Sequence, residues 1–117
     1  MKIKTLLPLL TLVCAASIIA QSSNYPAREA AKHVGETATI TDTVDGVHQM
    51  PGNNIFLNMG GKYPNQAFTA FIPSVNAAQF PNPQQYEGRT VAVSGKITLY
   101  KGKPEIIVSS PSQISVK

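Results

Sequence analysis

Hydrophobic and polar residues alternate in the C-terminal part of the chain, in two runs that a short turn joins. The apolar positions of the first run are Val91, Val93, Ile97 and Leu99. A period of two is typical of a β-strand with one buried face. Gly102 supplies the turn because glycine adopts positive φ freely, and the return run ends near Ser109. The segment from Gly88 to Ser109 therefore predicts a long β-hairpin. Gly95, inside its first strand, indicates a bulge or a sharp bend, as in small closed barrels.

Three earlier segments show the same alternation and predict strands over residues 36–49, 55–59 and 66–72. The phase changes near Asp45-Gly46, which indicates a bulge in the first of these strands. Ile55, Leu57 and Met59 of the second strand are expected to face the core, which directs Phe56 and Asn58 outward. In the third strand, Phe68, Ala70 and Ile72 share one face and Ala67, Thr69 and Phe71 share the other, so either Phe68 or Phe71 lies outside.

Two short helices and an edge segment complete the prediction. The first helix follows Asn24 as its N-cap and ends at Gly35. Its expected apolar stripe consists of Ala27, Ala30, Ala31 and Val34. The second lies between the third and fourth strands, over residues 75–80, with Ser74 as its N-cap. Residues 111–117 are expected to form an edge segment.

The first twenty residues resemble a secretory signal peptide. Met1 to Lys4 carries two positive charges, and an apolar run from Leu6 to Ala20 follows that is short for a membrane span. Cleavage after Ala20 or Ser22 is expected, and the alternative is an uncleaved N-terminal anchor. The predicted organisation is a signal peptide over 1–20, an N-terminal segment and helix over 21–34, and a barrel over 35–117. The expected location is the periplasm or the outside of the cell.

Cleavage would change both the charge and the cysteine content. The whole chain carries ten basic and six acidic side chains, a net charge of +4. Removal of Lys2 and Lys4 leaves eight basic residues and a net charge of +2, which is ordinary for a soluble domain. The single cysteine, Cys14, also lies in the leader, so the mature chain is expected to have neither disulfide nor thiolate chemistry.

The order of three strands, a short helix and a two-stranded hairpin resembles the OB-fold, from Gly35 to Ser109. The matching pieces are Gly-Glu-Thr-Ala-Thr-Ile at 35–40, Asn-Ile-Phe-Leu-Asn-Met-Gly at 54–60, Phe-Thr-Ala-Phe-Ile at 68–72, and the hairpin strands. The chain is similar to small exported bacterial OB-fold proteins. The resemblance implies an all-β, five-stranded Greek-key barrel whose middle strands and loops bind oligonucleotides or oligosaccharides.

A ligand groove on such a barrel needs aromatic side chains for stacking and lysines for phosphate. The candidates on the expected face and its loops are Phe56, Asn58, Lys62, Tyr63, Tyr100, Lys101 and Lys103. An alternative assigns structural roles to them. Phe56 and one phenylalanine of the third strand would pack under the helix, and the lysines would serve only as soluble turn residues.

The sequence offers little for catalysis or metal binding. His33 and His48 are the only histidines, and with Asp42 and Asp45 they do not make a metal-ligand motif. A nuclease would need clustered carboxylates and a basic group, and no such motif is present. We therefore expect no enzyme activity, no cofactor and no metal.

The leading hypothesis is a non-enzymatic binding module with weak affinity for single-stranded nucleic acid or another anionic polymer. The alternative is an envelope accessory protein that binds a protein or a small molecule in the groove.

Overall fold

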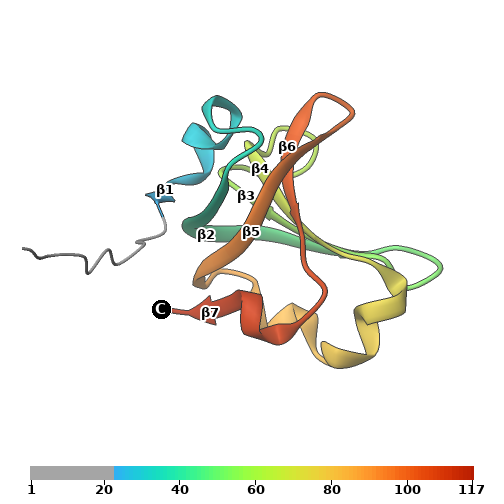
Figure 1. The fold of residues 1–117 in the computed structure, drawn as a ribbon. Helices are drawn as coiled ribbons and strands as arrows, with labels where there is room; N and C mark the ends of the chain where they lie inside the picture. Colours follow the sequence, from blue (N-terminus) through green and yellow to red (C-terminus); the bar gives the residue numbers. More distant parts are fainter. Residues whose placement is uncertain (1–22) are drawn as a thin grey trace, which may run out of the picture.

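The computed structural model describes residues 23–117, which are mostly β-structure (Figure 1). The predicted signal peptide, residues 1–20, lies outside the described residues. The strands are β1 (Asn24–Tyr25), β2 (Thr37–Gln49), β3 (Ile55–Met59), β4 (Phe68–Ile72), β5 (Thr90–Tyr100), β6 (Lys103–Ile107) and β7 (Ile114–Val116). Short 3-10 helices lie between them: η1 (Ala27–Lys32), η2 (Ser74–Gln79), η3 (Pro83–Tyr86) and η4 (Pro111–Gln113). None of the helices in this part of the chain is both long enough and apolar enough to cross a membrane.

The five long strands pair in a closed ring. The order is β2, β3, β4, β6 and β5, and β5 pairs in turn with β2. All neighbours in the ring are antiparallel except β4 and β6, which run parallel. The predicted bulge is present, because the register between β2 and β3 shifts between Val44 and Gly46. The predicted hairpin of β5 and β6 is also present, and its tip projects from the body in Figure 1.

The prediction of five strands is wrong in number, because the sheet has seven. β1 pairs parallel with β2, placing Asn24 opposite Thr39, and β7 pairs antiparallel with β5. β7 is the edge segment expected from the sequence. β1 was not expected, since Asn24 was assigned as a helix cap. A two-residue strand is too short to show alternation in the sequence, and β1 is recognised only by its backbone pairing with β2.

The core fills the inside of the ring with alternate side chains of its strands. Ile55, Leu57 and Met59 of β3 are fully buried, as predicted. The fully buried side chains of β4 are Phe68, Ala70 and Ile72, and this decides which of its two faces lies inside. This assignment turns Phe56 and Phe71 to the outer face of the sheet, where their exposure is intermediate. Phe56 is therefore not part of the buried core.

The helical segments differ in detail from the prediction. In η1, Ala27 and Ala30 are buried, but Ala31 and Val34 are exposed. A 3-10 helix stacks residues three apart, so the wider α-helical stripe does not form. The single helix expected between the third and fourth strands is replaced by η2 and η3, divided at Pro81 to Asn82. Ser74 does not cap η2 through its side chain.

Gly95 lies where β5 passes from one partner to the other. Residues 90–96 of β5 pair with β2, and residues 97–100 pair with β6. A Cβ at position 95 would lie 2.6 Å from Cγ2 of Ile106, and the backbone φ is +155°. The missing side chain therefore lets the strand bend tightly over the core, as the sequence predicted.

Candidate functional site

The outer face of the sheet carries an apolar row that crosses four strands. His48 of β2 lies opposite Phe56 of β3, and Phe56 lies opposite Phe71 of β4. Phe71 is in turn opposite Ile107 of β6. The rings of Phe56 and Phe71 are in contact, with centroids 5.1 Å apart and planes tilted by 41°. Strand register thus gathers, on an open surface, side chains that are distant in the sequence.

A polar row lies beside the apolar one. Asn58 of β3 is opposite Thr69 of β4, and Thr69 is opposite Glu105 of β6. The Thr69 hydroxyl donates to Oδ1 of Asn58 at 3.0 Å, and the Gln66 amide donates to that hydroxyl at 3.4 Å. Asn58, Gln66, Thr69 and Glu105 are all buried. Buried polar side chains on an outer face indicate that the surrounding loops rise above this row.

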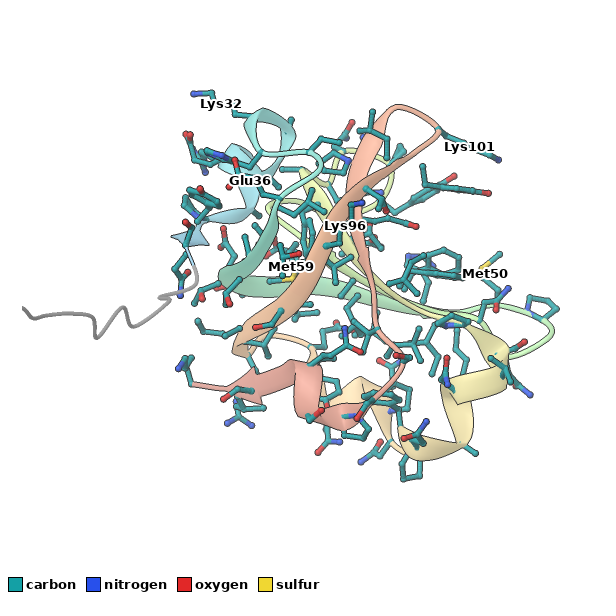
Figure 2. All side chains as sticks on the ribbon, viewed as in Figure 1. Lys32, Glu36, Met50, Met59, Lys96 and Lys101 are labelled. Carbon is teal, nitrogen blue, oxygen red and sulfur yellow. The ribbon has the colours of Figure 1, made fainter. Side chains whose placement is uncertain are left out.

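A groove of about 490 Å³ lies here, and its floor consists of the polar row together with His48 and Phe56 of the apolar row. One wall comes from the loop between β3 and β4, with Tyr63, and the other from the hairpin tip, with Tyr100. The complete lining is His48, Met50, Phe56, Asn58, Tyr63, Pro64, Gln66, Thr69, Tyr100, Lys101, Lys103, Pro104 and Glu105. Figure 2 labels Lys101 at the hairpin tip and Met50 after β2 on the same side of the molecule, away from Lys32 and Glu36.

A smaller hollow of about 110 Å³ continues from the groove. Phe56, Tyr100 and Glu105 line both spaces, and the smaller one adds Asn54 and Phe71. The two hollows therefore share one aromatic and acidic boundary.

Most of the residues predicted from the sequence lie together in this groove. The lining includes Phe56, Asn58, Tyr63, Tyr100, Lys101 and Lys103, and it omits Lys62. Lys62 belongs to the same loop as Tyr63 and is exposed. The ring of Tyr63 is 66% exposed and meets His48 edge-on, with centroids 5.7 Å apart.

The two lysines of the hairpin are in different environments. The ammonium of Lys103 donates to the backbone oxygens of Pro64 at 2.8 Å and Gln66 at 3.2 Å. It ties the β3–β4 loop to β6 and thereby fixes the wall that carries Tyr63. Lys101 is exposed and its ammonium lies 5.3 Å from the centroid of the Tyr100 ring. Lys101 can therefore meet an anion at the rim, whereas Lys103 is already bound to carbonyl oxygens.

Glu105, His48 and Gln66 also line the groove, although they were not predicted from the sequence. Burial raises the pKa of the Glu105 carboxyl above its ordinary value of 4.5. Alternation with the core residue Ile106 was the available signal, because it places Glu105 on the outer face with Phe56. His48 is adjacent to Phe56 by register, which only the bulge in β2 determines.

The remaining polar clusters of the described chain are structural. His33 bonds to a carboxylate oxygen of Glu36 at 2.7 Å and stacks on Tyr25 at 3.6 Å between centroids. Asp42 accepts from the backbone of Ala27 at 2.9 Å, so it fixes the start of η1. Within residues 23–117, no group of three or more histidine, cysteine or acidic side chains is arranged to hold a metal ion.

Two solved aspartyl-tRNA synthetases contain a similar arrangement. One, described as an aspartyl-tRNA synthetase of Leishmania major Friedlin, superposes with a TM-score of 0.53 at 11% identity, covering 91% of this chain and 23% of that chain. The other, from Entamoeba histolytica, has a TM-score of 0.51 at 17% identity, covering 95% of this chain and 28% of that one. The fold is OB-like. No protein-family model matches the sequence, and no curated protein matches it.

The OB-like fold allows the position of the groove to be compared with the ligand-binding face of other OB-folds. The chain spans about a quarter of the length of the two synthetases, and the low identities show the fold alone. The face formed by the middle strands and the flanking loops is where OB-folds bind oligonucleotides or oligosaccharides. The groove lies on that face.

Proposed function

We propose that this protein is a binding module for single-stranded nucleic acid and that the groove on β3, β4 and β6 is its binding site. The observation that carries the proposal is the convergence of Phe56, Tyr63 and Tyr100 on one groove with the exposed Lys101 at its rim. Aromatic rings offer stacking platforms to unpaired bases, and a rim lysine meets the backbone phosphates.

The likeness to two proteins named as tRNA synthetases supports a nucleic-acid ligand. The fold alone does not determine the ligand, because OB-folds also bind saccharides. The groove adds chemical support, since stacking surfaces and polar base-edge partners lie side by side in it. A duplex would keep its bases stacked and unavailable, so the ligand is single-stranded.

The expected affinity is low and depends on salt. Lys101 is the exposed cation among the residues that line the groove, since Lys103 is held by backbone oxygens. Each phosphate contact adds about one to the slope of log affinity against log salt, so a groove with few cations gives a shallow dependence. Stacking and base contacts then supply most of the binding free energy.

The test is fluorescence anisotropy with a labelled short oligonucleotide at about 50 mM and about 200 mM salt. Phe56→Ala should weaken binding by about 1–3 kcal/mol, the cost of one stacking platform. Val75→Ala is a control, because Val75 is 84% exposed and lies on η2, outside the groove. Failure of the wild-type protein to bind any single strand at the lower salt would refute the proposal.

Phe56 has intermediate exposure, so its removal must also be checked for folding. A fully buried phenylalanine costs about 3–5 kcal/mol when truncated, and Phe56 should cost less. A thermal melt of Phe56→Ala therefore precedes the binding assay. Binding is then compared at a temperature at which both proteins are folded.

A second candidate is the binding of a protein or small molecule in the same groove, in an accessory role. Glu105 is compatible with it, because its carboxylate can accept hydrogen bonds from N–H or O–H donors of a protein or small molecule. The same anisotropy experiment distinguishes the two, since an accessory protein of this kind would leave the oligonucleotide unbound.

We further propose that the module is exported and acts without catalysis. Export is supported by the charged and apolar leader from Met1 to Ala20. Mass spectrometry of the mature protein should then show an N-terminus at Gln21 or Ser23. A protein that retains Met1 in the cytosol would contradict export.

A further inference from the structure

The floor of the groove contains a carboxylate that stacking and phosphate contacts leave unused. Glu105 is 8% exposed and lines both hollows. Within residues 23–117, its carboxylate forms no hydrogen bond or ion pair with the protein, and both of its oxygens keep some contact with solvent. A buried carboxylate without a partner is unfavourable. Its place in a ligand groove therefore points to a ligand that supplies the partner.

The charge of Glu105 determines which part of a nucleotide can enter the floor. A phosphate would place an anion beside a poorly solvated anion, and the two would repel each other. A base edge instead carries N–H donors, which a carboxylate accepts. The base therefore enters the floor, and the phosphate stays at the rim with the exposed Lys101.

The walls around Glu105 suit a flat base. Phe56 and Tyr100 line both hollows together with Glu105. A base lying against either ring presents its edge, not its face, to the floor. Unpaired bases are commonly recognised in this way, with stacking on an aromatic ring and hydrogen bonds to the Watson–Crick edge.

We propose that Glu105 makes the groove selective for guanine among single-stranded bases, an inference that rests on the proposed function. Guanine carries two neighbouring donors, N1–H and the exocyclic N2 amino group, which match the two oxygens of one carboxylate. Adenine and cytosine offer an amino group beside a ring nitrogen that repels a carboxylate. Thymine offers one N–H between two carbonyl oxygens.

Asn58 adds a donor to the same polar row. Its Oδ1 already accepts from Thr69, so its amide nitrogen is the atom left for a ligand in the groove. Guanine O6 is an acceptor that neighbours N1–H, and a carboxylate and an amide together match this edge.

The test uses five labelled oligonucleotides that consist of thymine except at one central position. That position holds thymine, guanine, adenine, cytosine or hypoxanthine. Anisotropy should show guanine binding about five- to a hundredfold more tightly than thymine, the range for one good bidentate contact. Hypoxanthine keeps N1–H and O6 but lacks the N2 amino group, so it should lose most of this preference. The hypoxanthine comparison uses the unaltered protein.

Glu105→Gln replaces one acceptor oxygen by a donor and should bring the five oligonucleotides to similar affinities. Glu87→Gln is the matched control, because Glu87 is exposed and lies outside the groove lining. The control should retain the guanine preference. A melt of each variant shows that the comparison is between folded proteins.

The possible failures are distinguishable. If none of the five oligonucleotides binds, the proposed function and this inference both fail. If they bind with equal affinity, or another base is preferred, only the guanine inference fails. A guanine preference that persists in Glu105→Gln would assign base reading to another residue and would also overturn the inference.

Discussion

Three charged residues of one groove show how environment determines the role of a side chain. Lys101 is exposed beside the Tyr100 ring, and Lys103 is held between two carbonyl oxygens. Glu105 is buried at the floor, and the desolvation raises the pKa of its carboxyl. From the sequence alone, the two lysines of the hairpin cannot be distinguished. Their contacts distinguish an exposed cation at the rim, a lysine that anchors a loop and a mostly buried acceptor.

Replacement of Glu105 by glutamine should stabilise the protein at neutral pH. Because the folded-state pKa lies above the ordinary 4.5, the unfolded chain ionises first as the pH rises. The contribution of Glu105 to stability is thus most favourable below about pH 4.5 and is lost as the pH rises through the folded-state pKa. The melting temperature of Glu105→Gln should lie above that of the wild type near pH 7 and should equal it near pH 3. A wild-type protein that melts higher at neutral pH would contradict this.

The two lysines should differ in their effect on stability. Lys103→Met removes charged hydrogen bonds to two backbone oxygens and should cost about 1–3 kcal/mol in the free energy of unfolding. Lys101→Met removes only an exposed cation–π contact and should cost less than about 1 kcal/mol. Chemical denaturation measures both, and equal costs would mean that Lys103 does not anchor the loop.

Among the elements, the long strands were predictable and the short segments were not. The alternation in β2 to β6 extends over at least five residues in each strand. It identified the core residues of β3 and the bulge near Gly46, but it did not decide between the two faces of β4. β1 and the 3-10 helices are too short to carry a period, and neighbouring backbone determines them. Among the groove residues, Phe56 and those of the hairpin tip were predictable from the sequence. Alternation placed Glu105 on the outer face, but its burial there depends on segments that are distant in the sequence.

The bend in β5 gives a prediction at this scale. Gly95→Ala should destabilise the fold by about 1–3 kcal/mol, since the new Cβ would lie 2.6 Å from Ile106 and force the core to shift. Gly46→Ala is the control, because a Cβ at position 46 meets nothing within 4 Å. The midpoints of denaturant unfolding compare the two variants. A Gly95→Ala protein as stable as the Gly46→Ala protein would show that the bend tolerates a side chain.

At the scale of the whole molecule, an OB-like ring of strands presents one groove with aromatic walls and a polar floor. Two regions of the outer surface of the sheet carry different types of side chain. Around Thr39 and Ser94, where β2 pairs with β5, the face carries small hydroxyl side chains that bond to each other at 2.8 Å. The face over β3, β4 and β6 carries the phenylalanines and Glu105. This asymmetry is the basis for assigning the ligand to one side.

The most direct test of that assignment is amide chemical-shift mapping by NMR as a short single-stranded oligonucleotide is added. We predict that the largest shifts occur at Phe56, Tyr63, Tyr100, Lys101 and Glu105. Thr39 and Ser94, on the other side of the barrel-like ring, should remain unchanged and serve as internal controls. Shifts centred on Thr39 and Ser94, or no shifts at saturating oligonucleotide, would contradict the assignment of this groove to nucleic acid.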